Sequence, residues 1–253
     1  MLTMNTNKNR INELKTNRNP LKFEAVFNLA FENYKKIAIY AGLLLLVATI
    51  AFAILAFISI ALTYGIGNFQ ELIKPENLDP KKFSDAFLMV YFISITLFSC
   101  LISPFFAGFI KMAHAAQIDE EFHVASVFQY YKFSYFKELF LATFIISILN
   151  LGISSLFDTT GIPALGIFAS LTISFLSILA IPLIIFSDFK AIQAINTSFI
   201  LVSKQPLVLL GLLAVAYIFC FMGFFFFIIG LFFTIPFMYS MYYAIYNYII
   251  GFD

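Results

Sequence analysis

The chain has 253 residues, of which 62% are hydrophobic and 11% are charged. A soluble domain contains about 45–50% apolar and about 25% charged residues, so this composition excludes a soluble fold with an ordinary polar surface. The formal net charge of +1 also excludes the strongly basic surface that is typical of nucleic-acid-binding proteins, and we expect no nucleic-acid partner.

Residues 1–20 are polar and rich in asparagine, and they contain no apolar stretch that could serve as a cleavable signal. We therefore expect a polar N-terminal tail over residues 1–20 and a single transmembrane domain over residues 21–253, with the first span as an uncleaved anchor. Cys100 and Cys220 both lie in uncharged segments, so a disulfide framework is not implied.

Six segments of the chain are apolar enough to cross a lipid bilayer, whose core takes about 20 helical residues. None of them contains a charged residue, as expected where a buried charge is costly. The predicted spans are residues 37–64, 86–110, 139–157, 161–187, 207–222 and 224–249. The predicted fold class is therefore all-α, a polytopic membrane bundle of six transmembrane helices.

The last two predicted spans come from one uninterrupted apolar run, residues 207–250. A single helix of that length would rise about 66 Å, which is twice the thickness of the hydrocarbon core. The run is therefore predicted to fold back on itself near Met222 and Gly223, with Gly230 as the alternative turn position.

The lysine and arginine residues predict the direction of the spans. With six spans and a cytosolic N-terminus, the cytosolic segments hold twelve of these residues and the outer segments hold three. Basic residues are enriched on the cytosolic side of membrane proteins. We therefore expect a multi-pass protein of the cytoplasmic (inner) membrane with both termini in the cytosol.

Three polar segments on the cytosolic side have the periodicity of amphipathic helices, and we call residues 23–36, 124–137 and 191–204 the lead-in segments. Each ends in a lysine and precedes two spans, of which the second carries a proline in its cytosolic half. The residues are Lys36, Lys137 and Lys204, and Pro104, Pro182 and Pro236. The order indicates three hairpin units, each an interfacial helix plus two spans. The alternative is a coincidence of common features.

Basic and aromatic side chains near the cytosolic ends of the spans are candidates for contact with the membrane interface. The lysines would meet anionic lipid head groups of the inner leaflet. Because the chain has no tryptophan, tyrosines of the last span would supply the aromatic belt. The candidate interface residues are Lys35, Lys36, Lys137, Lys204, Tyr239, Tyr242, Tyr243 and Tyr246.

Two stretches of the chain carry a resemblance to a known family. They are GFIKMAHAAQIDEEFHVASVFQYYK after the second span and AINTSFILVSKQPLVLL with GFFFFIIGLFFTIPFMYSMYYAIY near the end. With them the chain resembles bacterial six-span membrane proteins of uncharacterised function, similar to the membrane domain that accompanies some glycerophosphodiester phosphodiesterases. The resemblance implies a six-helix inner-membrane protein, but no room remains for a phosphodiesterase catalytic domain.

Metal chemistry has little support in the sequence. Some proteins of the resembled group are labelled as carotene-cleaving oxygenases, whose chemistry uses four histidines around one iron, whereas this chain has only His114 and His123. The weak metal-ligand candidates are His114, Glu120 and His123, of which the last two have the i, i+3 spacing of helix-borne carboxylate–histidine sites. A solvated charged loop is the favoured interpretation, and we expect no cofactor.

The polar groups inside the spans favour packing roles. Asn150 is the most polar side chain deep in a span, and an interhelical hydrogen bond is favoured over a gate or substrate contact. Gly166, Ser170 and Ser174 recur every four residues, which is typical of a close helix–helix seam. A polar pore lining is the alternative.

Three classes of function remain after these exclusions. The first is a non-enzymatic membrane protein that organises, regulates or assists other membrane proteins. The second is a transporter, and since no span holds an ionisable group, its substrate would be apolar or lipid-like. The third is a membrane enzyme that acts at the cytosolic face with residues 111–137. The sequence shows no catalytic constellation, so the classes are ranked in that order and we predict that the chain is not an enzyme.

The predicted orientation can be tested with topology reporters. A reporter fused near Asn77 should report an external position, and one fused near Glu120 a cytosolic position, because basic residues crowd the side that includes Glu120. Alkaline phosphatase and green fluorescent protein fusions at both sites would measure this. The reverse pattern of signals would contradict the orientation.

Overall fold

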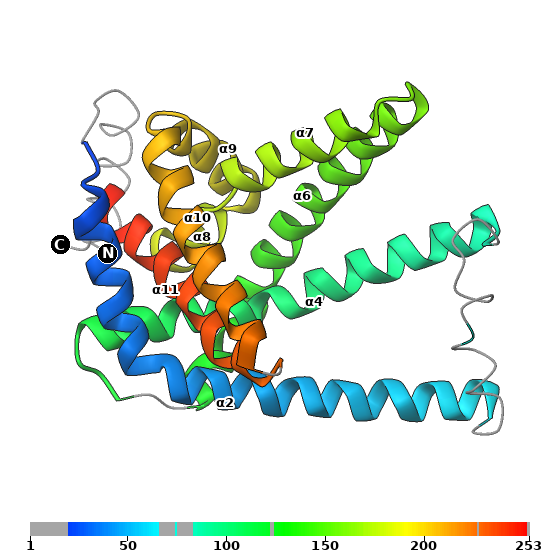
Figure 1. The fold of residues 1–253 in the computed structure, drawn as a ribbon, viewed down its shortest axis with the longest axis horizontal. Coiled ribbons are helices and arrows are strands. Elements are labelled where there is room, and N and C mark those ends of the chain that lie inside the picture. Colours follow the sequence, from blue (N-terminus) through cyan, green and yellow to red (C-terminus); the bar gives the residue numbers. More distant parts are fainter. Residues whose placement is uncertain (1–19, 66–73, 75–82, 122–123, 227, 252–253) are drawn as a thin grey trace.

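The computed structural model describes residues 20–65, 74, 83–121, 124–226 and 228–251, and every regular element in this part of the chain is a helix (Figure 1). The elements are α2 (Phe23–Tyr64), α4 (Asp85–Gln117), α5 (Val124–Phe128), η4 (Gln129–Tyr131), α6 (Phe133–Thr159), α7 (Pro163–Leu176), α8 (Ala180–Ser187), α9 (Ala191–Val202), α10 (Pro206–Met222), η5 (Gly223–Phe226) and α11 (Ile229–Ile249). The predicted all-α fold class is confirmed.

Six stretches of helix within the described residues are long and apolar enough to cross a membrane. They are Phe23–Thr63, Asp85–Gln117, Phe133–Thr159, Pro163–Ser187, Pro206–Phe226 and Ile229–Ile249. Each contains most of one predicted span, and several extend beyond it by one or more helical turns. The chain is thus a multi-pass membrane protein by the length and composition of its helices.

The long apolar run folds back where the sequence predicts. α10 ends at Met222, η5 follows, and Ile228 adopts a positive φ of 63° before α11 begins. The two candidate glycines lie against each other, since a Cβ added to Gly230 would be 2.3 Å from the carbonyl oxygen of Gly223. Thr234 of α11 donates a hydrogen bond to the carbonyl of Cys220 at 3.0 Å, which ties the two helices together below the turn.

The three prolines affect their helices differently. Pro104 and Pro236 lie inside α4 and α11, which continue through them. The fourth span is broken into α7 and α8 about one turn before Pro182, because proline cannot donate to the carbonyl four residues earlier and its ring crowds that group. At the break, the hydroxyl of Ser198 on α9 accepts from the amide of Leu179 at 3.1 Å and donates to the carbonyl of Leu176 at 2.6 Å.

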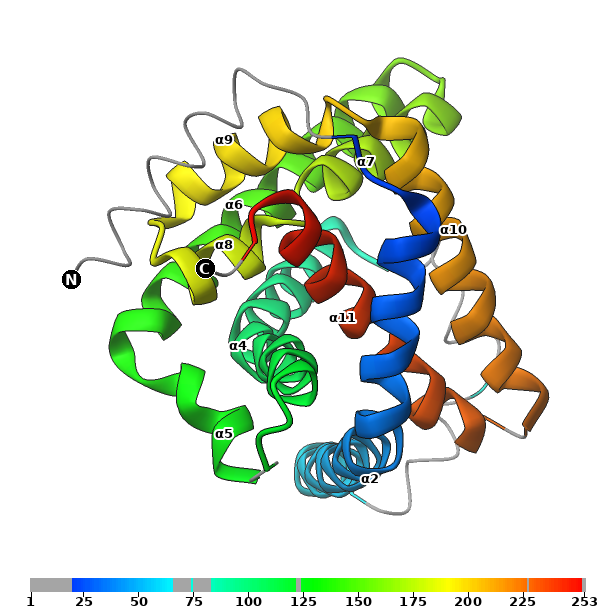
Figure 2. The ribbon, with the colours of Figure 1, turned by 90° about the vertical axis from the view of Figure 1, so that its left-hand side faces the viewer.

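The lead-in segments form helices, but the first is not a separate element. α5 with η4 and α9 are short helices that precede α6 and α10. The first segment, by contrast, is continuous with the first span in the 42-residue α2. The two parts of α2 run in different directions (Figures 1 and 2), so the change of direction predicted between lead-in and span is a bend within one helix.

Each lead-in helix packs against the second span of another unit, and the three contacts close a ring. α5 packs on α4, where Gly108 lies directly against Val127. α9 packs on the break between α7 and α8 through Ser198. The first part of α2 packs on α11, where Ser240 donates to the carbonyl of Ala30 at 2.7 Å. Figure 2 shows these lead-in helices around the ends of α4, α8 and α11.

Further local details recur between the predicted units. The residue after each of two lead-in lysines accepts a backbone hydrogen bond at or just before the start of another lead-in helix. Glu138 accepts from the amide of Ala191 at 2.8 Å, and Gln205 accepts from the amide of Leu21 at 2.7 Å. A residue of positive φ follows each second span, at Asp119 (53°), Asp188 (51°) and Gly251 (80°). These details support the interpretation of three related hairpin units.

The packed core lies at the lead-in end of the bundle. The buried side chains come from the first part of α2, the later part of α4 and most of α8, α9 and α11. Toward the other end, α2, α4 and the α6–α7 pair diverge (Figure 1), and apolar side chains such as Phe52, Leu55 and Met89 are exposed there. In a bilayer these surfaces would be covered by lipid.

The contact between α4 and α5 yields a stability prediction. A Cβ at position 108 would lie 2.6 Å from the carbonyl oxygen of Val127, so Gly108→Ala must push α5 away from α4. We expect the free energy of unfolding in detergent to fall by about 1–3 kcal/mol, as for other overpacked sites. Thermal or denaturant unfolding of the purified protein measures this.

The matched control for that prediction is Gly152→Ala on α6. A Cβ there would meet no atom within 4 Å, so the substitution should be neutral or stabilise the helix by up to about 1 kcal/mol. Equal stability of the Gly108→Ala variant and the wild-type protein would show that the α4–α5 contact is loose.

Candidate functional site

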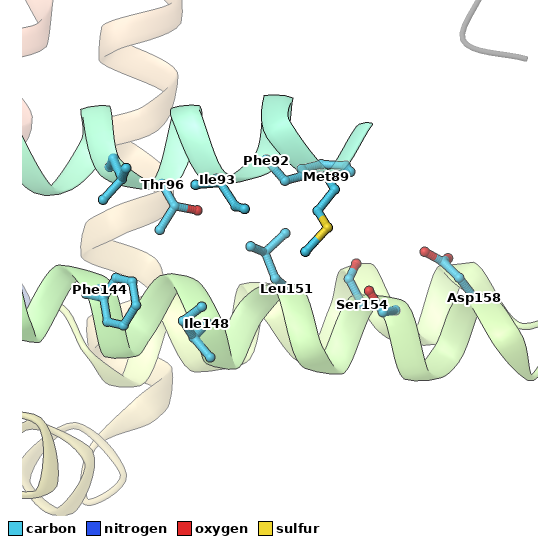
Figure 3. Close-up of a pocket in the computed structure, with 11 residues that line it drawn as sticks. Met89, Phe92, Ile93, Thr96, Phe144, Ile148, Leu151, Ser154 and Asp158 are labelled. Carbon is cyan, nitrogen blue, oxygen red and sulfur yellow. The ribbon is translucent and has the colours of Figure 1, made fainter. Parts of the chain in front are cut away.

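A cleft of about 580 Å³ lies between α4 and α6 (Figure 3). α4 lines it with residues spaced three and four apart, which is one face of a helix, and α6 lines it with a similarly spaced face. The lining residues are Met89, Phe92, Ile93, Thr96 and Leu97 of α4, and Phe144, Ile148, Leu151, Ser154, Ser155 and Asp158 of α6. We call this volume the α4–α6 cleft.

The cleft exists because α4 and α6 touch at one end and separate toward the other. Leu139 and Ala142, in the first part of α6, are buried in the core. Toward the far end of the bundle α4 and α6 diverge (Figure 1), and Figure 3 shows Met89 and Leu151 pointing across the gap toward one another. The walls are thus aliphatic and aromatic, with a single threonine hydroxyl among them.

The open end of the cleft is polar. Ser154, Ser155 and Asp158 lie in the last two turns of α6. A carboxylate at a helix C-terminus is disfavoured by the helix dipole. Asp158 is exposed, and no ion pair joins it to another side chain within the described residues. Its carboxylate is therefore available to a cationic or hydroxyl-bearing group at the mouth of the cleft.

Asn150 lies on α6 but serves the contact with α7. Its side-chain amide donates to Ser174 at 3.2 Å, and Ser170 donates to the backbone carbonyl of Asn150 at 3.3 Å. Gly166 completes the seam, since a Cβ there would lie 3.1 Å from the side chain of Phe157. The predicted interhelical hydrogen bond and packing seam are both confirmed, and they hold α7 against α6, which lines one side of the cleft.

The candidate metal ligands lie in different surroundings. His114 faces the bundle, where its Nδ1 is 3.0 Å from the hydroxyl of Tyr243 and its ring packs on Phe186. Glu120 is exposed in the connection after α4, and His123 lies outside the described residues. Within the described part of the chain, no group of three or more histidine, cysteine or acidic side chains could hold a metal ion.

The four tyrosines of α11 that were candidates for an aromatic belt, Tyr239, Tyr242, Tyr243 and Tyr246, face the protein core instead of lipid. Tyr243 and Tyr246 are fully buried, and the hydroxyl of Tyr246 bonds Ser187 of α8 at 2.7 Å. Tyr239 and Tyr242 are partly buried against the core. The helical spacing that we interpreted as an aromatic belt therefore directs this face into the bundle, and Tyr243 and Tyr246 cannot anchor the protein in lipid.

The candidate interface lysines differ in their ion pairs and in their exposure. Lys35 pairs with Glu32 on the surface of α2, at 2.7 Å. Lys36 pairs with Asp119 and donates to the carbonyl of Ala116, so it joins α2 to the end of α4. Lys204 is half-buried beside the start of α10, whereas Lys137 is exposed at the edge of a separate cavity.

The chain matches no protein-family model, no curated protein and no solved structure. The predicted resemblance to six-span bacterial membrane proteins therefore stays a prediction. The α4–α6 cleft, with a volume of about 580 Å³ and a mostly apolar lining, has the properties of a small-molecule site.

The sequence contains no signal that would have located the cleft. Apart from Asn150 and a few serine and threonine residues, both helices are apolar in this region, so periodicity does not separate a ligand-facing side from a lipid-facing one. The sequence shows only the polar group at its mouth, because Asp158 ends the third charge-free segment.

Proposed function

We propose that this chain is a non-enzymatic protein of the cytoplasmic membrane that binds a lipid-like amphiphile in the α4–α6 cleft. The observation that carries the proposal is the pairing of an apolar cleft between two spans with a polar group at its mouth. An acyl chain would fill the apolar part, and the head group would meet Ser154, Ser155 and Asp158.

The surroundings of the cleft favour a membrane lipid as its ligand. The cleft lies between helices that would be embedded in a bilayer, and its volume is within the range of about 300–1,000 Å³ that is usual for ligand sites. Displacing bilayer lipid from the two walls gains little, because lipid tails are as apolar as the side chains themselves. The polar mouth is therefore the part that would select one lipid over another.

The charge distribution supports a lipid ligand over an ion-coupled substrate. Coupled transport usually places an ionisable group at mid-membrane, and none of the six predicted spans contains one. The sequence ranks an organising or accessory role above lipid carriage, but the cleft favours lipid binding. A protein that binds lipid and also assists other membrane proteins would be consistent with the sequence ranking and with the cleft.

The proposed orientation assigns the mouth of the cleft to one leaflet. With the N-terminus in the cytosol, the third span runs outward, so Asp158 lies at the outer surface of the cytoplasmic membrane. The head group of the bound lipid would then belong to the outer leaflet of that membrane.

Filling the cleft should remove bound lipid. Ile148→Trp adds a large side chain to the middle of the α6 wall, where it occupies the path of an acyl chain. We expect the amount of copurified lipid to fall about fivefold, since overpacking typically costs at least 1 kcal/mol. Native mass spectrometry of protein extracted in mild detergent measures the occupancy.

The control for this experiment is Ile167→Trp on α7. Ile167 is 61% exposed and apolar, but it does not line the cleft, so its substitution should leave the occupancy unchanged. If the two variants retain the same amount of lipid as the wild-type protein, the cleft is not the binding site.

The head group should be selected by charge at the mouth of the cleft. Asp158→Asn removes the carboxylate, and we expect the preference for phosphatidylethanolamine over phosphatidylglycerol to fall by up to about fivefold, the size of an exposed ion pair. Competition between the two lipids, followed by native mass spectrometry, measures the preference. Glu120→Gln, an exposed carboxylate at the lead-in end, is the control. An unchanged preference in Asp158→Asn would exclude a head-group role for this residue.

A further inference from the structure

We infer that a second cavity, at the lead-in end of the bundle, binds the head group of an anionic phospholipid. This cavity of about 660 Å³ lies between the start of α6 and the start of α9, and we call it the Lys137–Lys190 cavity. Lys137 and Lys190 supply two cationic side chains, and Gln193 and Asn196 of α9 supply amide groups. It is separate from the α4–α6 cleft and shares no lining residue with it.

A cavity in the first unit resembles this one, but its lysine forms an ion pair with an acidic side chain of the same chain. That cavity, of about 590 Å³, is lined by Lys36 and by Tyr40 four residues later. The Lys137–Lys190 cavity is lined by Lys137 and by Leu141 four residues later. The two lysines end the first and second lead-in segments, so the two cavities occupy corresponding places in two of the predicted units.

The two cavities differ in charge. In the first, the connection after α4 places Asp119 against Lys36 and adds Glu120 and Glu121 to the lining. In the second, the connection after α8 contributes Lys190 to the lining, whereas its Asp188 does not line the cavity and Glu138 is the one acidic lining residue.

The acidic groups near the second cavity form no ion pair with its lysines. Glu138 lines the cavity, but its carboxylate accepts from the backbone amide of Ala191. Asp188 lies beside Tyr135 in a neighbouring cavity that Lys190 also lines, and it does not line the second cavity. Neither Lys137 nor Lys190 forms an ion pair with another described residue. No acidic side chain of the described residues pairs with these two lysines as Asp119 pairs with Lys36, so an anion from outside the chain can take that place.

The lining matches a phospholipid head group at a membrane surface. Lysine ammonium groups bind phosphate as point charges, and side-chain amides can donate to the remaining phosphate oxygens. Leu141 and Ile192 are exposed apolar side chains that also line the cavity, and they would contact the acyl chains below the phosphate. An anionic lipid supplies both the phosphate and the acyl chains, whereas a soluble phosphate supplies only the first.

The test is a titration of the full-length protein, in mild detergent, with phosphatidylglycerol and with phosphatidylcholine, followed by native mass spectrometry. The wild-type protein should prefer phosphatidylglycerol. Lys137→Gln and Lys190→Gln should each reduce that preference about fivefold, because a lysine near an anionic lipid contributes about 1 kcal/mol. Lys190→Asp should abolish the preference, since it reproduces the self-paired arrangement of the first cavity.

Two controls make the result specific. Lys132→Gln removes an exposed lysine that does not line the cavity and should leave the preference unchanged. Ile167→Trp, which lines neither this cavity nor the α4–α6 cleft, should also leave it unchanged. Lys137→Arg and Lys190→Arg keep the charge and should retain the preference, which separates charge from any effect on folding.

Three outcomes would overturn the inference. One is a double variant Lys137→Gln, Lys190→Gln with wild-type preference for phosphatidylglycerol. Another is an equal loss in Lys132→Gln, which would indicate a diffuse surface charge effect. The third is displacement of phosphatidylglycerol by glycerol phosphate at equal concentration, which would identify a site for soluble phosphate compounds.

Discussion

Close contact between lead-in helices and proline-containing spans is the constraint on which this structure depends. Between membrane helices there is no hydrophobic driving force, because lipid is as apolar as the helix surface, so association relies on small residues and hydrogen bonds. The chain concentrates such contacts at one end. Gly108 admits Val127, Ser198 bridges the break before α8, and Ser240 bonds Ala30 across the ring. The bundle is closed there, whereas α2, α4 and the α6–α7 pair diverge toward its other end (Figure 1).

The α4–α6 cleft is a consequence of that uneven distribution. α6 and α7 stay together along their length because Asn150 and Gly166 join them within the membrane. α4 has no such partner on α6 beyond Thr96, so the two helices separate and their apolar faces line the gap. A ring of contacts at one end thus leaves, at the other, a volume that suits an acyl chain.

The sequence predicts the number and limits of the spans because charge is excluded from a bilayer core, and a gap between charges can be read directly. It also predicts the fold-back at Gly223 and the α6–α7 seam, since both depend on small residues at definite positions. It does not predict which way a face of an all-apolar helix points. For that reason the stripe with Tyr243 was interpreted as a lipid-facing belt, and the α4–α6 cleft gave no signal.

Long-range pairing is the other property that sequence reasoning missed. Lys36 and Lys137 end similar segments and look equivalent in the sequence, and both were predicted to contact anionic lipid. Only the structure shows that Lys36 forms an ion pair with Asp119, 83 positions away, whereas Lys137 shares the lining of a cavity with a second lysine. The same pattern therefore has two roles: one lysine joins two helices, and the other stays open to a ligand.

The two sites proposed for lipid lie at opposite ends of one helix. The 21 residue steps of α6 from Lys137 to Asp158 rise about 32 Å at 1.5 Å per residue, close to the thickness of a hydrocarbon core of about 30 Å. Both charges can then lie at a membrane surface while the apolar residues between them span the core. A lysine at one end and a carboxylate at the other would favour anionic head groups in one leaflet and ammonium-bearing head groups in the other. The length of α6 thereby assigns the two sites to different leaflets, and one lipid cannot occupy both.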